Sequence, residues 1–201
     1  MSQQLFEKVR SLIDTANSED PNNELDENSK AWPKEHLYAQ RMSNVLQRYT
    51  PDADDVCKLA LRAQHIQRWK SPRNAYPMDR IGYLKWRTDL YQFHAETLGK
   101  LMQQAGYSAA DIERAGKMVG KKNLKSNPDT QLLEDVAGLV FIEYYMLAFA
   151  EKHPEYSEEK WIGIIQKTWK KMSAKAQQFA LSDGIRLPEP LLPLIQKALK
   201  A

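Results

Sequence analysis

The chain has 201 residues, of which 42% are hydrophobic, and its 29 basic and 26 acidic side chains give a formal net charge of +3. This length is enough for one compact domain, and so small a charge excess excludes a strongly basic protein of the kind that coats nucleic acid. The single cysteine, Cys57, excludes an internal disulfide and a cysteine-based zinc cluster, and no apolar run is long enough to cross a membrane, so we expect a cytoplasmic protein without a membrane partner.

Apolar residues recur every three or four positions along nearly the whole chain, and no convincing alternation of apolar and polar residues marks a strand. This spacing predicts an all-α fold, a single-domain helical bundle that spans residues 1–201. In chain order, the predicted helices are one that includes residues 5–13, followed by 34–49, 52–69, 80–105, 109–121, 130–152, 158–172 and 173–183.

Two segments lie outside this regular pattern. Residues 18–29, "SEDPNNELDENS", carry five acidic side chains and no basic one, together with helix-breaking Pro and Asn, which predicts a solvated internal loop. Residues 185–201 form a C-terminal tail that contains three prolines and keeps helical spacing only loosely. We expect the apolar cluster of this tail to cover its own domain, although contact with another chain is the alternative.

The predicted helix 130–152 is apolar on nearly every face between Leu132 and Ile142, which is typical of a helix at the centre of a bundle. Glu134 and Asp135 interrupt this apolar surface. A buried ionised carboxylate is costly unless it is paired, hydrogen-bonded or bound to a metal, so at least one of the two should have a cationic partner. Two interpretations stay open, namely a solvent-facing Glu134 with Asp135 paired to an arginine, or a metal site.

Two histidines lie among basic residues. Steps of seven residues place Arg80, Arg87 and His94 along one face of the predicted helix 80–105, and leucines on the same face indicate that His94 enters the interior. His65 has Arg62 and Arg68 at helical spacing. Each histidine is either a hydrogen-bonded interior group or a ligand.

Positive charge is concentrated between positions 62 and 87, where seven basic side chains face a single acidic one, Asp79. The basic residues are Arg62, Arg68, Lys70, Arg73, Arg80, Lys85 and Arg87. Arginine suits phosphate or carboxylate because its planar fork binds two oxygens at once. The alternative is that these arginines pair with the acidic segment or with the carboxylates of the apolar helix. Nucleic-acid recognition is less favoured, since the residues span a proline-broken loop and two helices.

Several phrases of the sequence stand out together, namely "LYAQRM", "LRAQHIQRW", "PRNAYPMDRIGYLKWR", "FHAE", "AGY" and "LEDVAGLVFIE". Over residues 33–180 they resemble the signature of a bacterial family known as domain of unknown function 4202. That family is distantly similar to the HD-domain phosphohydrolases, helical proteins that hold a metal with histidines and aspartates from separate helices. The resemblance implies an HD-like bundle in which His65, His94 and Asp135 bind a single divalent metal.

The same resemblance implies roles for other residues. Glu96 or Glu134 would act as the general base or supply a further oxygen ligand. The phosphate would be held by Arg68, Arg73, Arg80 and Arg87. The sequence departs from the HD pattern because His94 is followed by Ala95 instead of aspartate. Sequence motifs of P-loop, dinucleotide-binding, zinc-protease and serine-hydrolase sites are absent.

The leading hypothesis is therefore a metal-dependent phosphohydrolase that acts on a small phosphorylated metabolite or nucleotide. It predicts that Asp135→Asn abolishes activity and leaves the fold largely intact. The alternative is a non-catalytic module that binds an anion or a partner through an arginine-rich pocket, and a third hypothesis is an RNA-binding accessory protein.

Overall fold

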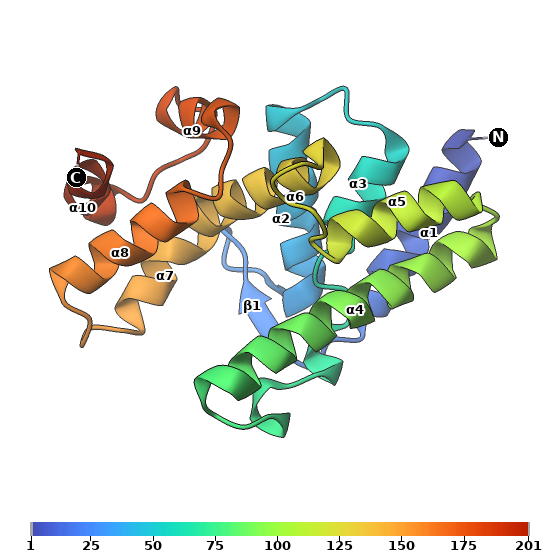
Figure 1. Ribbon diagram of the computed structural model, residues 1–201, viewed down its shortest axis with the longest axis horizontal. Helices are drawn as coiled ribbons and strands as arrows, with labels where there is room; N and C mark the ends of the chain where they lie inside the picture. Colours follow the sequence, from blue (N-terminus) through green and yellow to red (C-terminus); the bar gives the residue numbers. More distant parts are fainter. Residues whose placement is uncertain (1, 201) are drawn as a thin grey trace.

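Helices account for most of residues 2–200, the part of the chain that the structure, a computed structural model, describes (Figure 1). They are α1 (Ser2–Ser18), α2 (Lys34–Tyr49), α3 (Asp55–Arg62), α4 (Arg80–Ala105), α5 (Ala109–Val119), α6 (Pro128–Val140), α7 (Met146–Glu151), α8 (Glu158–Trp169), α9 (Ala174–Leu181) and α10 (Leu192–Lys200). A π-helical turn, Phe141–Tyr145, joins α6 to α7, so the predicted helix 130–152 is present as one continuous element. The predicted all-α fold is confirmed apart from one short hairpin.

Local capping chemistry sets the ends of the helices that matter most for the site. Asn127 begins α6 because its side chain accepts a hydrogen bond from the backbone N–H of Asp129 at 3.0 Å, and Pro128 occupies the first helical position. Gly106 ends α4 with a φ of 101°, a left-handed conformation that favours glycine. Both signals are visible in the sequence, and the predicted limits of α4 and α5 agree closely with the structure.

The predicted helix 52–69 is wrong in its length. Asp54 caps the helix by accepting a hydrogen bond from the Cys57 N–H at 2.9 Å, so α3 begins only at Asp55. At its other end, Gln67 adopts a left-handed φ of 51°, and its N–H donates to the Asn17 side chain at 3.0 Å. The chain therefore leaves the helix after Arg62, and the following residues form turns instead of a helical face.

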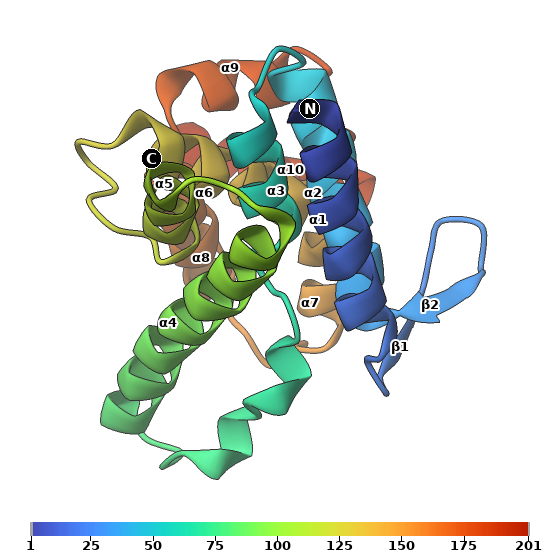
Figure 2. The ribbon, with the colours of Figure 1, turned by 90° about the vertical axis from the view of Figure 1, so that its right-hand side faces the viewer.

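The segment between α3 and α4 forms a projecting arm, residues 67–79, which contains two short 3-10 turns (Figure 2). The arm is anchored to α4, since the Trp86 indole N–H donates to the Ser71 carbonyl at 2.9 Å. Close packing requires glycine at position 82, because a Cβ there would lie 2.1 Å from the Pro77 carbonyl oxygen. The arm and the first turns of α4 therefore form one unit that carries Arg68, Trp86 and Arg87.

One hydrophobic core joins the helices into a single domain. Helices α2 and α6 cross at its centre, α4 packs against α1 and α5, and α8 packs against α10 (Figure 1). Each of five helices contributes a fully buried side chain, namely Met42, Leu59, Leu98, Met118 and Leu133. Burial of each such side chain stabilises the fold by roughly 1.5–3 kcal/mol relative to exposure. In the tail, Ile195 and Ala198 of α10 are buried in the same core, so the tail covers its own domain as predicted.

The acidic segment is more ordered than the sequence predicts. It forms an antiparallel hairpin of β1 (Asn23–Leu25) and β2 (Ala31–Pro33), in which Glu24 pairs with Trp32 in register (Figure 2). The nearly buried guanidinium of Arg41 forms ion pairs with Glu24 and with Glu27, the latter at 2.9 Å. Paired carboxylates lose the charge repulsion that would keep the segment open. The arginine that balances this acidic segment thus lies on α2, outside the basic cluster.

Within residues 2–200, none of the helices combines the length and the apolar character needed to cross a membrane.

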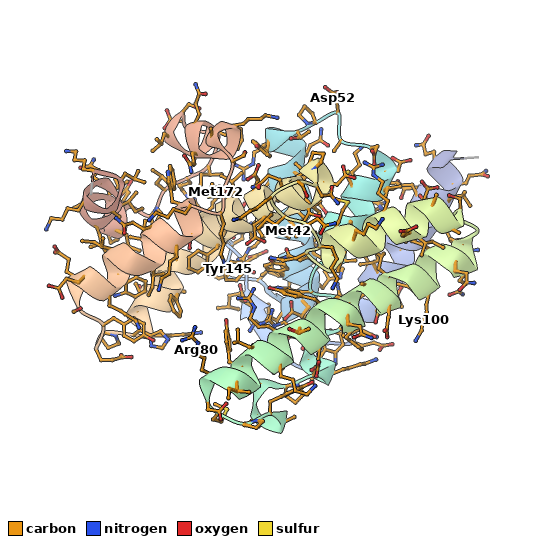
Figure 3. All side chains as sticks on the ribbon, viewed as in Figure 1. Met42, Asp52, Arg80, Lys100, Tyr145 and Met172 are labelled. Carbon is orange, nitrogen blue, oxygen red and sulfur yellow. The ribbon has the colours of Figure 1, made fainter. Side chains whose placement is uncertain are left out.

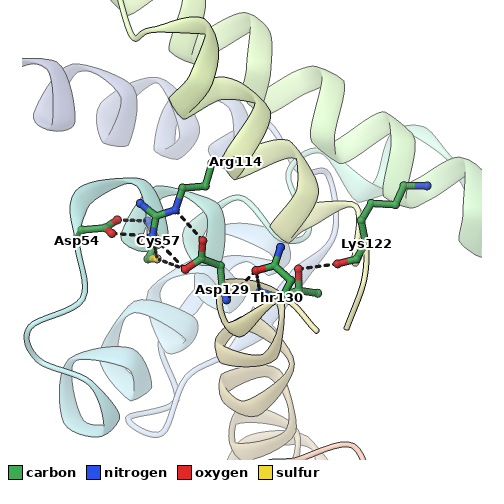
Figure 4. A network of polar contacts seen from close by, with 7 residues as sticks. Asp54, Cys57, Arg114, Lys122, Asp129 and Thr130 are labelled. Carbon is green, nitrogen blue, oxygen red and sulfur yellow. Dashed lines mark hydrogen bonds and ion pairs between the residues drawn. The ribbon is translucent and has the colours of Figure 1, made fainter. Parts of the chain in front are cut away.

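A polar network fixes the start of α6 against α3 and α5 (Figure 4). The Arg114 guanidinium on α5 lies 2.6 Å from Asp129 and 2.7 Å from Asp54, and it also contacts the Cys57 sulfur at 3.3 Å. Burial raises the pKa of the Cys57 thiol to about 12, so this thiol is a packing group instead of a nucleophile. The network sets the position of the helix that carries Glu134 and Asp135.

We predict that Arg114→Met lowers the free energy of unfolding by about 1 kcal/mol, because two carboxylates lose a shared, partly exposed partner. Hydrogen bonds from Arg114 hold the pKa of Asp129 below its ordinary value. A carboxylate with a lowered pKa stabilises the fold above about pH 4 and loses this contribution as the pH falls through the lowered pKa. The difference in the free energy of unfolding between wild type and variant should therefore become smaller as the pH is lowered from 7 to 3.

Urea unfolding at both pH values measures this difference. Lys117→Met on the same helix is the matched control, since exposed Glu113 is the only ion-pair partner of Lys117 among residues 2–200. A variant as stable as wild type at pH 7 would contradict the bridging role of Arg114.

Candidate functional site

A cavity of about 600 Å³ lies between α4, α6 and the arm, and both predicted histidines line it. Its volume is that of a site for a small ligand. The cationic residues in its wall are Arg68, Arg87, Lys121 and Lys171, and Glu134 is the acidic one. The aromatic residues are Tyr83, Trp86, Tyr91, Phe141 and Phe149.

His94 enters this cavity from α4, as its spacing with Arg87 and the leucines predicts. The ring is 2% exposed, and its Nδ1–H donates to the Ile66 carbonyl at 2.9 Å. This bond leaves Nε2 as the lone-pair nitrogen, and Nε2 is buried without any partner within residues 2–200. Burial, and to a smaller extent the neighbouring His65, lowers the pKa of His94 to about 3, so the ring is neutral at physiological pH.

His65 reaches the same cavity from the turn after α3. Its ring centroid lies 6.1 Å from that of His94 and stacks on Tyr38 at 4.1 Å. Arg68 donates to its Nε2 at 2.9 Å, and its Nδ1 lies 3.4 Å from a Glu35 carboxylate oxygen. Burial and the positive charge of Arg68 hold the pKa of His65 well below its ordinary value. Both imidazoles are therefore neutral ring systems in one cavity.

The guanidinium groups of Arg68 and Arg87 are held by aromatic side chains. Arg68 lies over the Trp86 ring at 5.1 Å, and Arg87 donates to the hydroxyls of Tyr83, at 3.3 Å, and Tyr91. Within the described chain, neither guanidinium forms an ion pair with a carboxylate. Two half-buried positive charges thus face the cavity without a negative partner.

Glu134 lines the cavity and has the cationic partner that the sequence predicts. Its carboxylate lies 2.5 Å from Lys121 Nζ and 3.8 Å from Lys171 Nζ. Burial raises the pKa of Glu134, but the positive charges of Lys121, Lys171 and Arg87 together bring it below the ordinary value. Lys121 adopts a left-handed φ of 51°, a conformation that is uncommon for a residue other than glycine.

Asp135 is not brought to the histidines. It is 2% exposed and does not line the cavity. Its oxygens accept hydrogen bonds from the Tyr49 hydroxyl at 3.0 Å, from the Gln131 amide at 2.8 Å, and from the backbone N–H and hydroxyl of Ser173, both at 2.6 Å. No arginine pairs with it in the described chain. These contacts join α2 and α6 to the start of α9, because Ser173 caps that helix.

Three other predicted residues also lie away from the cavity. Glu96 is exposed and accepts a hydrogen bond from Gln92 at 2.8 Å. It follows His94 by two residues, a rotation of about 200° around the helix axis, so the two side chains lie on nearly opposite faces of α4. Arg73 braces the arm by donating to the Tyr76 and Asp79 carbonyls, each at 3.2 Å. Arg80 is exposed at the N-terminal end of α4 (Figure 3).

The predicted metal ligands do not form a metal site in this structure. Within residues 2–200, no three histidine, cysteine, aspartate or glutamate side chains are grouped so that they could hold a metal ion. The Nε2 atom of His94 is free, whereas that of His65 accepts from Arg68 and Asp135 is engaged elsewhere. The set of His65, His94 and Asp135 therefore does not fit a metal in this arrangement.

Sequence reasoning missed Glu35, Tyr38, Lys121 and Lys171. Glu35 and Tyr38 share a helical face with the buried Met42, at steps of three and four residues, which is a signal that they point inward. The π-helical turn at Phe141 was also missed, although such turns are frequent at functional sites. Lys121 and Lys171 come from separate loops, and only the tertiary fold brings them together at Glu134.

A family model described as "Domain of unknown function (DUF4202)" matches residues 7–195, nearly the whole chain. The chain belongs to this family. The match extends beyond the predicted span of 33–180 at both ends and includes every residue that lines the cavity. Neither a search of curated proteins nor a search of solved structures returns a match to the chain.

We predict that Asp135→Asn lowers the free energy of unfolding by roughly 2–3 kcal/mol, because an amide NH₂ would face donors and leave a buried hydrogen bond unmade. This expectation replaces the sequence-based one, in which the substitution leaves the fold intact. Urea unfolding measures the change, and Glu96→Gln is the control, with an expected change below about 0.5 kcal/mol. Equal stability of Asp135→Asn and wild type would contradict the structural role of Asp135.

Proposed function

We propose that this protein binds a small phosphate-bearing anion in the cavity between α4 and α6. The observation that carries the proposal is that Arg68 and Arg87 face the cavity without a carboxylate partner in the described chain. Their hydrogen-bond acceptors are neutral and leave both positive charges uncompensated, and two guanidinium forks can together hold the oxygens of one phosphate.

The charge balance of the cavity supports the same function. Four cationic side chains face the single carboxylate of Glu134, which is shared by Lys121 and Lys171. The net charge of the wall is therefore positive, and the neutral ring of His94 does not change it. Such a field attracts an anion, and the aromatic side chains that hold the arginines exclude water around it.

We predict that Arg87→Gln weakens the binding of inorganic phosphate at least tenfold, because one charge-assisted hydrogen bond contributes roughly 1.5–3 kcal/mol. Isothermal titration calorimetry with inorganic phosphate measures the dissociation constant. Arg80→Gln is the matched control, since Arg80 belongs to the same sequence cluster but is exposed outside the cavity.

The control should bind phosphate as wild type does. An equal loss of phosphate affinity in the two variants would indicate a general effect of net charge and would contradict a site at Arg87. No phosphate binding by the wild-type protein would remove the proposal altogether.

Hydrolysis of a bound phosphate ester is a second candidate function, and it is the activity that the resemblance of the sequence to HD-domain phosphohydrolases implies. The observation that favours it is the buried, unpartnered Nε2 of neutral His94, a residue that lines the cavity and whose lone pair can orient an attacking water by accepting its hydrogen bond. Arg68 and Arg87 would stabilise charge on the phosphoryl oxygens. Because the predicted ligand set does not fit a metal, no step of this reaction is assigned to a metal ion.

We predict that, if the protein is a hydrolase, His94→Gln lowers phosphate release from phosphate esters at least a hundredfold and changes the affinity for inorganic phosphate less than threefold. A phosphate-release assay with and without added divalent metals measures turnover. Elemental analysis of wild type and of the His65→Ala, His94→Ala variant reports any bound metal independently of activity. Absence of turnover in every condition would leave a binding module, and unchanged turnover in His94→Gln would exclude a role for His94 in orienting the attacking water.

A further inference from the structure

A second cavity of about 370 Å³ adjoins the proposed phosphate site. The two cavities share five lining residues, which are His65, Arg68, Ala137, Phe141 and Phe149. A molecule anchored by its phosphate at Arg68 can therefore extend along this shared wall into the second cavity. The composition of the second cavity then indicates which kind of group the rest of that molecule carries.

The interior of the second cavity is aromatic. Tyr38 and Tyr145 from α2 and the π-helical turn lie with ring centroids 5.8 Å apart, and Phe141 and Phe149 complete the wall. The cationic side chains that belong to this cavity alone, Lys34 and Lys152, are solvent-exposed at its rim. The first cavity differs because one of its two lysines, Lys121, has a side chain that is only 15% exposed. A flat aromatic group can stack on the faces of these rings, whereas a polar sugar would leave the ring faces without a stacking partner.

Glu35 places one hydrogen-bonding group among these rings. Its residue is 5% exposed, and its only side-chain polar contact in the described chain is the 3.4 Å approach to His65 Nδ1. Burial raises the pKa of Glu35 to about 7. A buried carboxyl group with one long contact keeps unused hydrogen-bonding capacity, which a ligand N–H group can satisfy.

We propose that the second cavity binds a nitrogen-containing aromatic ring of the same ligand whose phosphate occupies the first cavity. The ring lies against the Tyr38, Phe141 and Phe149 side chains, and an N–H group of the ring or its amino substituent donates to Glu35. This inference rests on the proposed function and narrows it, since it selects an aromatic, nucleotide-like phosphate ester over an aliphatic sugar phosphate.

Calorimetry with three probes tests the inference, namely inorganic phosphate, ribose 5-phosphate and adenosine 5′-monophosphate. We expect adenosine 5′-monophosphate to bind wild type at least tenfold more tightly than ribose 5-phosphate. Ala148→Trp should remove this advantage by filling the second cavity, because Ala148 is exposed and lines only that cavity. The affinity of the Ala148→Trp variant for inorganic phosphate should stay within twofold of the wild-type value.

Two further variants complete the design. Glu35→Leu replaces the carboxyl group with an apolar side chain of similar size and should cut the advantage of adenosine 5′-monophosphate over ribose 5-phosphate at least threefold. The comparison is made as a ratio of the two esters because loss of the Glu35 charge near Arg68 acts on both phosphates alike. Glu151→Trp, on the same helix as Ala148 but outside both cavities, should behave as wild type. Thermal unfolding confirms that each variant is folded.

The outcomes separate the two proposals. Equal affinities of wild type for ribose 5-phosphate and adenosine 5′-monophosphate would overturn the aromatic subsite while leaving the phosphate site standing. An undiminished advantage in Ala148→Trp would likewise overturn it. Failure of wild type to bind inorganic phosphate and both esters would overturn the proposed function, and the subsite with it.

Discussion

The arrangement of the site follows from one constraint, the burial of two adjacent carboxylates on the central helix α6. Neighbouring residues on a helix point about 100° apart, so Glu134 and Asp135 cannot face the same surroundings. Asp135 faces α2 and the cap of α9 and is satisfied by neutral donors, while Glu134 faces the cavity and is satisfied by Lys121 and Lys171. One carboxylate therefore joins helices, and the other sets the charge of the cavity.

The positive wall of the cavity is stable without a ligand because aromatic groups, instead of carboxylates, hold the arginines. The Trp86 face and the Tyr83 and Tyr91 hydroxyls position Arg68 and Arg87 but do not neutralise them. A carboxylate in their place would stabilise the fold more and would compete with an incoming phosphate. The anchoring of the arm to α4 through Trp86 and Gly82 thus has a direct consequence for the electrostatics of the site.

Local signals in the sequence predict the fold better than they predict the site. Asn127 with Pro128 and Gly106 act on their own helix ends, so their effect can be inferred without tertiary structure. The direction of His94 follows from its helical spacing for the same reason. Arg80 shares that spacing, yet α4 extends past the body of the domain at this end, and sequence periodicity does not show where a neighbouring helix stops (Figure 3). Glu35 was missed because its partners, His65 and the rings around it, come from distant segments.

The pair of Glu35 and His65 links the two cavities electrostatically. Burial disfavours the charged form of each group, raising the pKa of Glu35 to about 7 and lowering that of His65, and the positive charge of Arg68 lowers the latter further. A phosphate bound at Arg68 would offset the part of this lowering that comes from Arg68, while the larger effect of burial would remain, so the pKa of His65 would rise on binding. A higher pKa in the bound state means that the complex takes up protons more readily than the free protein. Anion binding in the first cavity and the protonation state beside the second are therefore coupled through a single imidazole ring.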